Sequence, residues 1–321
     1  MLGTRRALLL AALAAPALGR AQDFPIRPLR IVVPFAPGGA SDLVARVLAE
    51  PLGAALGQPV IVDNRPGAGG NLGAEVVVRA APDGHTLLMG APGALTVNPH
   101  LYANMPFDPA RDLAPVSLVF TTDHLVVVNP GVPARNLAEF IALARARPGA
   151  ISYASAGIGA TTHLFGELFR LRARVELTHI PYRGSGPAVA DLVGGTVQAM
   201  FDQLPSCIGH VQAGRLRALA VTGPARNALL PAVPTAAEAG LADYVVTSWN
   251  ALLVPAGTPA PIVQRLAGLV AEALALPAVR ERLAPLGADP AASSPAALGA
   301  LLREERARWG QVVREAGITV G

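Results

Sequence analysis

Two glycine-containing segments, one in each half of the chain, have the composition of anion-binding loops. Pro34–Asp42 reads Pro-Phe-Ala-Pro-Gly-Gly-Ala-Ser-Asp, and Ser155–His163 reads Ser-Ala-Gly-Ile-Gly-Ala-Thr-Thr-His. Each follows an apolar strand pattern and precedes a helical one. Glycines let backbone N–H groups approach a ligand, and a helix N-terminus adds about half a positive charge. Together these features favour the binding of a small anion such as a carboxylate.

Each loop also has a purely structural interpretation. Ser41 or Asp42 could cap the following helix, so the first loop could be a tight strand–helix turn without a ligand. In the second loop, Ser155, Thr161 and Thr162 can donate hydrogen bonds to a carboxylate. Two such loops in corresponding places indicate two helix N-termini that face one cleft, which favours the binding interpretation.

Other polar segments have weaker signals. Asp202 follows the apolar segment Val197–Phe201, where it could meet a ligand amine or hydroxyl or cap the next turn. Tyr182–Gly186 follows another strand pattern and is a further cleft candidate. The glycine-rich segment Arg65–Gly73 lacks the lysine of a phosphate-binding loop, and Leu72 stands where a dinucleotide-binding pattern needs glycine. A structural loop is the favoured interpretation there.

Arrangements typical of enzymes are poor. The sequence contains neither a His-Glu-x-x-His nor a Gly-x-Ser-x-Gly pattern. His163 and Glu167 could share one helix face, but two ligands without a third do not make a catalytic zinc site. The single cysteine, Cys207, excludes an intramolecular disulfide. We therefore expect no catalytic residue, no metal site and no cofactor.

Length and charge set further bounds. The 321 residues correspond to roughly two domains. All 26 basic residues are arginine, against 22 acidic residues. No arginine run is interleaved with aromatic residues, so a nucleic-acid partner is not expected.

The first 21 residues have the anatomy of an export signal. Arg5 and Arg6 form a charged start, Ala7–Leu18 is an apolar run, and Gly19-Arg20-Ala21 is a small-x-small cleavage site. The apolar run is shorter than the about 20 residues that span a bilayer. The mature chain is expected to begin near Gln22, in the periplasm and without stable membrane insertion. Its route, general secretory or twin-arginine, stays open.

Short apolar segments alternate with helical spacings along the mature chain. Strands are expected at 29–35, 60–62, 85–89, 125–128, 151–154, 175–180, 197–201, 216–221 and 250–254. Helices are expected at 41–52, 72–80, 136–147, 162–172, 187–193, 261–275 and 295–316. This alternation predicts an α/β fold with mostly parallel sheets, in which ligands bind beyond the carboxyl ends of strands. Crossovers are expected near Thr121–His124 and Ala239–Ser248.

An ordered set of short motifs resembles one known family along nearly the whole mature chain. The set comprises Phe24-Pro-x-Arg-Pro28, Val33-Pro-Phe-Ala-Pro-Gly-Gly39 with Asp42, Leu56-Gly-Gln-Pro-Val60, Asn64-Arg-Pro-Gly-Ala-Gly-Gly-Asn71, Pro82-Asp-Gly84, Asn98-Pro with Leu101-Tyr102, Tyr153-Ala-Ser-x-Gly157 with His163-Leu164, Pro181-Tyr-Arg-Gly184, Phe201-Asp202 and Val254-Pro-Ala-Gly-Thr-Pro259. Together they resemble the periplasmic substrate-binding subunits of tripartite tricarboxylate transporters, the Bug family.

The resemblance implies a fold and a site. The fold would be a two-domain Venus flytrap related to type II periplasmic binding proteins. Residues 22–123 plus 246–321 would form one domain, and residues 124–245 the other. A ligand carboxylate would sit between the two loops. The residues carried over are Phe35, Pro37, Gly38, Gly39, Ser155, Gly157, Thr161 and His163, with Asp202 on the far side. One departure is Ala91-Pro92-Gly93, which replaces the small hydroxyl residues expected there.

The implied function is capture of a small organic carboxylate and its delivery to membrane transporter subunits. One alternative is a sensor that presents the bound solute to a signalling receptor. Another is a secreted hydrolase, which would need a nucleophile that the sequence does not reveal.

Overall fold

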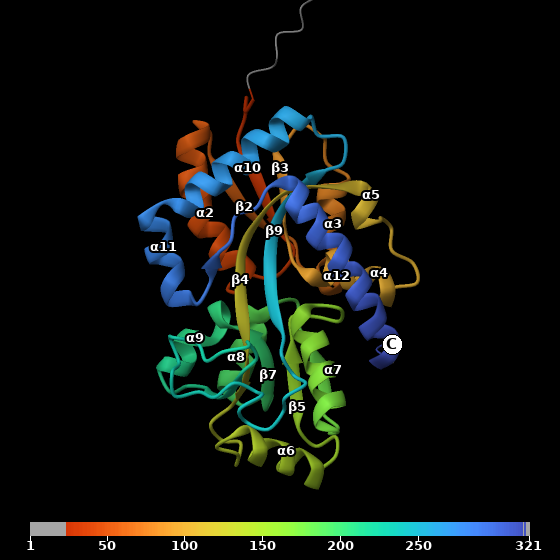
Figure 1. Cartoon of the computed structure of the whole chain (residues 1–321), viewed down its shortest axis with the longest axis vertical. Coiled ribbons are helices and arrows are strands. Elements are labelled where there is room, and N and C mark those ends of the chain that lie inside the picture. The colour runs from red at the N-terminus through yellow and green to blue at the C-terminus, as the bar shows by residue number, and fades with distance from the viewer. Residues whose placement is uncertain (1–23, 317, 319–321) are drawn as a thin grey trace, which may run out of the picture.

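The computed structural model describes residues 24–316 and 318, and shows two halves joined through a pair of long strands (Figure 1). The expected export signal at residues 1–21 lies outside the described residues. The N-terminal third and the C-terminal helices make up the upper half in this view, and the middle of the chain makes up the lower half.

The upper half is a sheet covered by helices on both faces. Its strand order is β2-β1-β3-β9-β4. β1 pairs in parallel with β2 and β3, whereas β9 is antiparallel to both β3 and β4. Its elements are β1 (Leu29–Val33), α2 (Ala40–Leu56), β2 (Val60–Asn64), α3 (Asn71–Val78), β3 (Thr86–Gly90), η3 (Gly93–Val97), α4 (Asn98–Leu101), α5 (Pro109–Asp112), β9 (Thr247–Pro255), α10 (Ala260–Ala275), α11 (Pro277–Leu283), β10 (Asp289–Pro290) and α12 (Pro295–Ala316).

The lower half repeats the strand–loop–helix plan around a smaller sheet. Its order from the joining strand is β4-β7-β5-β6, with β8 also paired to β4. β5 is parallel to β6 and β7. Its elements are α6 (Leu137–Ala146), β5 (Ser152–Ser155), α7 (Thr161–Ala173), β6 (Thr178–Pro181), α8 (Ser185–Gly194), β7 (Ala199–Gln203), α9 (Leu204–Gln212) and β8 (Arg217–Val221).

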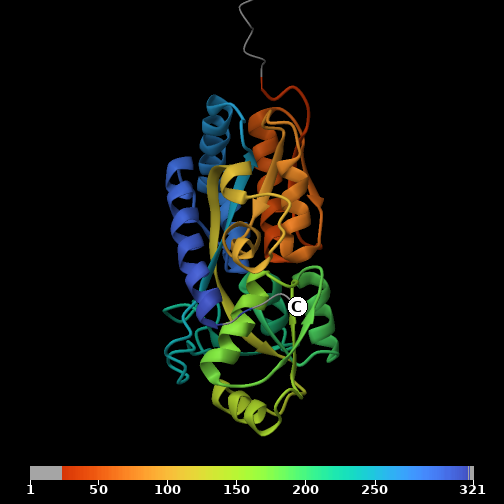
Figure 2. The same ribbon diagram turned by 90° about the vertical axis from the view of Figure 1, so that its right-hand side faces the viewer.

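The strand β4 (Leu113–Val128) belongs to both sheets. Residues 113–123 pair with β9, and residues 124–128 pair with β7 and β8. Thr121–His124, where a crossover was expected, is therefore an uninterrupted stretch of strand that passes from one half to the other. In Figures 1 and 2 the helices α10 and α11 and the first part of α12 pack on the upper half, whereas the end of α12 reaches the lower half beside α7. There Trp309 and Val313 join the core of the lower half, and Trp309 stacks on Phe165.

The observed elements differ from the expected ones at points that bear on the site. The sheets are mixed rather than mostly parallel, because β4 and β9 run between the halves and pair antiparallel with their neighbours. The helix α9 was not anticipated. It starts at Leu204 directly after β7, with Pro205 in its first turn, where proline is tolerated because the N–H there needs no helical partner.

The helix α6 begins as its sequence predicts. The Asn136 side chain accepts a hydrogen bond from the Glu139 N–H at 2.9 Å, and Glu139 Oε2 accepts one from the Arg135 N–H at 2.7 Å. Replacing Asn136 with alanine should lower the free energy of unfolding by about 1 kcal/mol, because the cap is lost. Urea unfolding of Asn136→Ala beside Asn136→Ser measures this. Both variants lose the hydrogen bond from Asn136 Nδ2 to Glu139, but serine keeps an oxygen that can accept the Glu139 N–H, so equal losses in both would contradict the capping role.

Among the described residues, no single helix is long and apolar enough to cross a membrane. Only α10 taken together with the segment Pro277–Leu286 passes that test, and the pair is bent by 73°. In the structure both helices contribute buried side chains to the core of the upper half, including Leu266, Val270 and Leu283.

Candidate functional site

A small cavity lies where the two halves meet. Its volume is about 20 Å³, which is room for about one water molecule. Both halves line it, with Phe35, Gly39, Ala40, Ser41, Ala91, Ala156, Ala160, Thr161, Thr162, Ser185 and Gln203. Four helices begin at its wall: α2 at Ala40, α7 at Thr161, α8 at Ser185, and α9 directly after Gln203. The structure is therefore closed around a point at which four positive helix ends converge.

The first loop is held by Asp42, whose side chain is 3% exposed. Its Oδ2 accepts the Gly38 N–H at 3.0 Å, and its Oδ1 accepts Asn64 Nδ2 at 3.0 Å. Burial opposes the charge of Asp42, but the bonds from Arg46, Gly38 and Asn64 prevail and lower its pKa. Neither Ser41 nor Asp42 is the N-cap, which is Gly39. Asp42 thus fixes the loop from behind, while the Ala40 and Ser41 N–H groups have no partner among the described residues.

In the second loop, four N–H groups are turned inward. Ala156 donates to Thr162 Oγ1, Gly157 to Ser155 Oγ, Gly159 to His163 Nδ1, and Ala160 to the Gly157 carbonyl. The N–H groups of Ile158, Thr161 and Thr162 have no partner among residues 24–316. The loop therefore offers three unused donors, two of them on residues that line the cavity.

Two lining residues add side-chain groups: Gln203, at the end of β7, and Ser185, at the start of α8. Gln203 is 7% exposed, and its Nε2 has no hydrogen-bond partner in the described part of the chain. Ser185 donates from Oγ to Asp202 at 2.7 Å. Gln203 is a free donor for an anion, and Ser185 presents an accepting oxygen.

Asp202 lies behind this wall and does not line the cavity. It is fully buried and also accepts a hydrogen bond from Ser206 Oγ at 2.5 Å. Burial raises its pKa to about 6, although the two serines oppose the shift. It contacts the cavity through Ser185.

The structure brings all nine sequence-predicted site residues to this junction but gives them different positions. Phe35, Gly39 and Thr161 line the cavity. Ser155, Gly157 and His163 hold the second loop together. Pro37 and Gly38 lie on the seam where the halves meet. Thr162, which the sequence analysis named as a donor to a carboxylate, also lines the cavity. The lining residues to which the sequence analysis gave no ligand role are Ala40, Ser41, Ala91, Ala156, Ala160, Ser185 and Gln203. Ser185 falls within the cleft candidate Tyr182–Gly186, which is the signal that could have found it.

The halves meet backbone to backbone along a glycine seam. A Cβ atom on Gly186 would overlap the Pro37 carbonyl oxygen, and one on Gly69 would overlap the Ile158 carbonyl oxygen. Hydrogen bonds cross the seam from the Ala36 N–H to the Arg183 carbonyl at 2.9 Å and from Tyr102 Oη to the Ile158 carbonyl at 2.9 Å. The loop Arg65–Gly73 forms part of this seam, where Gly69 contacts the other half.

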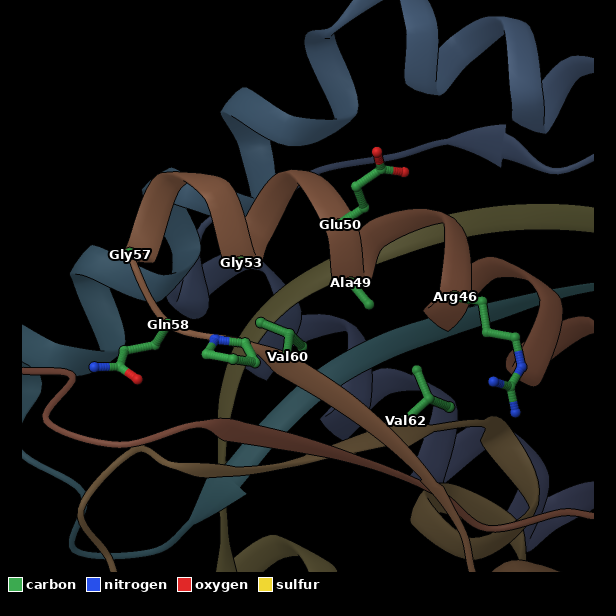
Figure 3. Close-up of a pocket in the computed structure, with 9 residues that line it drawn as sticks. Arg46, Ala49, Glu50, Gly53, Gly57, Gln58, Val60 and Val62 are labelled. Carbon is green, nitrogen blue, oxygen red and sulfur yellow. The ribbon is translucent and has the colours of Figure 1, made fainter.

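A larger groove lies elsewhere, between α2 and the sheet-edge strand β2 (Figure 3). Its volume is about 660 Å³, and its lining includes Ala49, Gly53, Val60 and Val62. Arg46 at its rim is already bonded to Asp42 and Asn64. No helix N-terminus converges on it, so it lacks the anion-binding features of the small cavity.

Comparisons with known proteins show the family of this chain. The profile described as tripartite tricarboxylate transporter family receptor matches residues 44–318. Protein BugT of Bordetella pertussis is 42% identical over 308 residues, which cover 96% of this chain and 94% of that protein.

Solved structures of similar proteins contain carboxylates. A protein from R. palustris, solved with adipate, is 38% identical and has a TM-score of 0.89, covering 92% of this chain and 99% of that one. MatC from Rhodopseudomonas palustris, with bound malate, is 37% identical and has a TM-score of 0.87, covering 90% of this chain and 100% of that one. On these grounds the chain belongs to the tripartite tricarboxylate transporter receptors of the Bug type, which are periplasmic solute-binding proteins and not enzymes.

Proposed function

We propose that this receptor captures a small organic carboxylate in the cavity between its halves and delivers it to the membrane subunits of a tripartite tricarboxylate-type transporter. The observation that carries the proposal is the meeting of four helix N-termini, unused backbone N–H groups and the free Gln203 donor at one point. No lining residue carries a charge, so backbone dipoles would hold the anion.

Capture requires the halves to separate. The cavity has room for about one water molecule, and a four-carbon dicarboxylate is several times larger than that. We infer that residues 22–123 plus 246–321 move as one domain and residues 124–245 as the other. The hinge would lie where β4 passes between sheets, at Asp123 and His124, and where the chain returns at Val246 and Thr247.

The place of action would be the periplasm, reached through the export signal at residues 1–21. For delivery, the transporter subunits would recognise the closed form. Only in that form do the surfaces of the two halves lie next to each other along the seam.

A thermal-shift screen of the mature chain, unfolded and refolded to remove any carried-over ligand, tests the proposal. The panel would contain malate, adipate, other small carboxylates, amino acids and aromatic acids. A ligand at 100 times its dissociation constant should stabilise the protein by about 2.7 kcal/mol. The uncharged diamide of each active acid is the matched control and should have no effect. Equal shifts with acid and diamide would contradict carboxylate recognition by the helix ends.

A flat panel would lead to native mass spectrometry of the protein as purified. A bound small acid would retain the proposal and identify the ligand. A protein that carries no acid and responds to none would overturn it.

A further inference from the structure

Two histidines accept hydrogen bonds from the back of the second loop. His163 Nδ1 accepts the Gly159 N–H at 3.2 Å. His179 Nε2 lies 2.6 Å from Ser155 Oγ, and that oxygen accepts the Gly157 N–H at 3.1 Å. Because the Ser155 hydroxyl has no other acceptor among the described residues, it donates to His179. The two imidazoles thereby fix the orientation of the Gly157 and Gly159 amides.

The two rings form part of a stacked column. The centroids of His163 and His179 are 4.3 Å apart with an interplanar angle of 25°, and His179 stacks on Tyr153 at 4.9 Å and 24°. Tyr153 Oη donates to Glu167 at 2.5 Å, and Glu167 pairs with Arg170 at 2.6 Å. The column is therefore anchored at its far end by groups on β5 and α7.

We propose that His163 and His179 are positioning residues, which draw the Gly157 and Gly159 amides away from the cavity so that the N–H groups of Ile158, Thr161 and Thr162 remain for the ligand. This inference rests on the proposed function, because it assigns those three donors to a carboxylate. Neither histidine lines the cavity, so both act through the loop. The role of His163 is thus different from the ligand contact implied by the family resemblance.

The arrangement requires both rings to be neutral, since a protonated imidazole has no lone pair to accept with. Burial, reinforced by His163, lowers the pKa of His179 to about 3 against the opposing charge of Glu167. Burial also lowers the pKa of His163, with Glu167 opposing and Arg170 reinforcing the shift. Tyr153, Glu167 and Arg170 are the other ionisable groups that act on the pair. Both rings should therefore be neutral at pH 7, and the loop should keep its geometry there.

Long-range proton–nitrogen NMR of the ligand-free mature chain tests the pair without any ligand. His163 should carry its proton on Nε2 and His179 on Nδ1, as opposite tautomers, and neither ring should titrate near pH 6.5. Titration of either ring near pH 6.5, or a proton on Nδ1 of His163, would overturn the inference whether or not a carboxylate binds.

Variants with L-malate as the probe test the consequence for binding. His163→Leu and His179→Leu remove the acceptors and should each weaken binding about tenfold, while hydrogen exchange at Gly159 and Gly157, respectively, accelerates. His163→Asn and His179→Gln keep an acceptor near Nδ1 and Nε2 and should restore most of both. His210→Leu, in the last turn of α9, is the control and should change neither. Unchanged hydrogen exchange at Gly157 and Gly159 in the leucine variants would overturn the inference. If the unsubstituted chain does not bind L-malate, that result counts only against malate as the ligand, and hydrogen exchange still tests the role of the histidines.

Discussion

Replacing Gly186 with alanine should lower the affinity for a cleft ligand about a hundredfold while both halves stay folded. Gly186 lies in the first turn of α8, and its φ is outside the left-handed region, so alanine suits the backbone of its own half. The added Cβ would overlap the Pro37 carbonyl oxygen of the other half. The cost falls on the closed form alone, and affinity falls with the fraction of molecules that can close. A penalty of about 3 kcal/mol corresponds to about a hundredfold.

Gly194 provides a matched control in the same helix. No heavy atom lies within 4 Å of a Cβ built there, so Gly194→Ala adds the same methyl group to α8 without touching the seam. Titration calorimetry with the acid found by the screen would measure affinity in both variants. Small-angle X-ray scattering would measure closure, which should be lost in Gly186→Ala and kept in Gly194→Ala. Normal affinity and closure in Gly186→Ala would show that the seam in this structure is not the ligand-bound interface.

The seam also explains why glycine is frequent in segments with different sequence patterns. Gly38 and Gly186 face each other, with the Gly186 Cα 3.5 Å from a Cβ built on Gly38, and Gly93 lies against the Gly159 carbonyl. At these points backbone approaches backbone across the junction. A glycine pattern typical of ligand-binding loops can therefore occur because the two halves must approach closely. Gly69 is an example, since it lies in the loop Arg65–Gly73, which the sequence analysis interpreted as a structural loop.

The two candidate loops could be predicted because their signals are local. Glycines and hydroxyl residues between a strand pattern and a helix pattern identify Pro34–Asp42 and Ser155–His163 without any tertiary information. The contribution of Gln203 is not local. It faces the cavity because β7 pairs with β4 in a register that sets Gln203 opposite His124, 79 residues earlier in the chain.

The length of β4 could not be predicted for a similar reason. Its first part contains Pro115 and the polar run Thr121–Asp123, which gives no strand pattern. It is a strand because β9, more than 120 residues later, pairs with it from Leu113 to Asp123. The role of His179 could not be predicted either. It depends on stacking against His163, which joins β6 to α7, and no spacing in the sequence indicates that contact.

The substitution His124→Leu should raise stability and reduce its dependence on pH. His124 is fully buried at the passage of β4 between the halves, and neither ring nitrogen has a partner among the described residues. Its ring meets Phe165 edge-on at 4.4 Å. Two unpaired polar atoms buried in this way oppose folding, so leucine should increase the unfolding free energy at pH 7 by about 1–3 kcal/mol.

The effect on pH dependence has a definite sign. Burial lowers the pKa of His124 to about 3, against about 6.5 in the unfolded chain. Between these pH values the unfolded state binds more protons than the folded state. The pH-dependent contribution of His124 to the unfolding free energy is therefore fully present above pH 6.5 and is lost as the pH falls toward 3. The loss is about 1.4 kcal/mol per pH unit, or about 3 kcal/mol from pH 6.5 to pH 4. His179 acts in the same direction.

Asp202 acts in the opposite direction. Burial raises its pKa to about 6, so its ionisation costs stability as the pH rises from about 4 to 6. Burial also lowers the pKa of His163 and His210, so more histidines than His124 and His179 lose their contribution as the pH falls, and the protein should lose stability on acidification. His124→Leu removes one of these contributions, and its stability should fall by about 3 kcal/mol less between pH 6.5 and pH 4.

Urea unfolding of the mature chain at pH 7, 6, 5 and 4 measures both parts of this prediction. His100→Gln is the control, because His100 is exposed and its Nε2 lies 2.8 Å from the Arg306 carbonyl, a contact that glutamine can keep. A slope equal to that of the unsubstituted chain would mean that His124 does not carry the lowered pKa. A loss of carboxylate affinity in His124→Leu would instead indicate that the His124 ring supports ligand binding through Gln203, because the two residues are paired across β4 and β7. The unpaired ring nitrogens would then serve binding rather than only lowering stability.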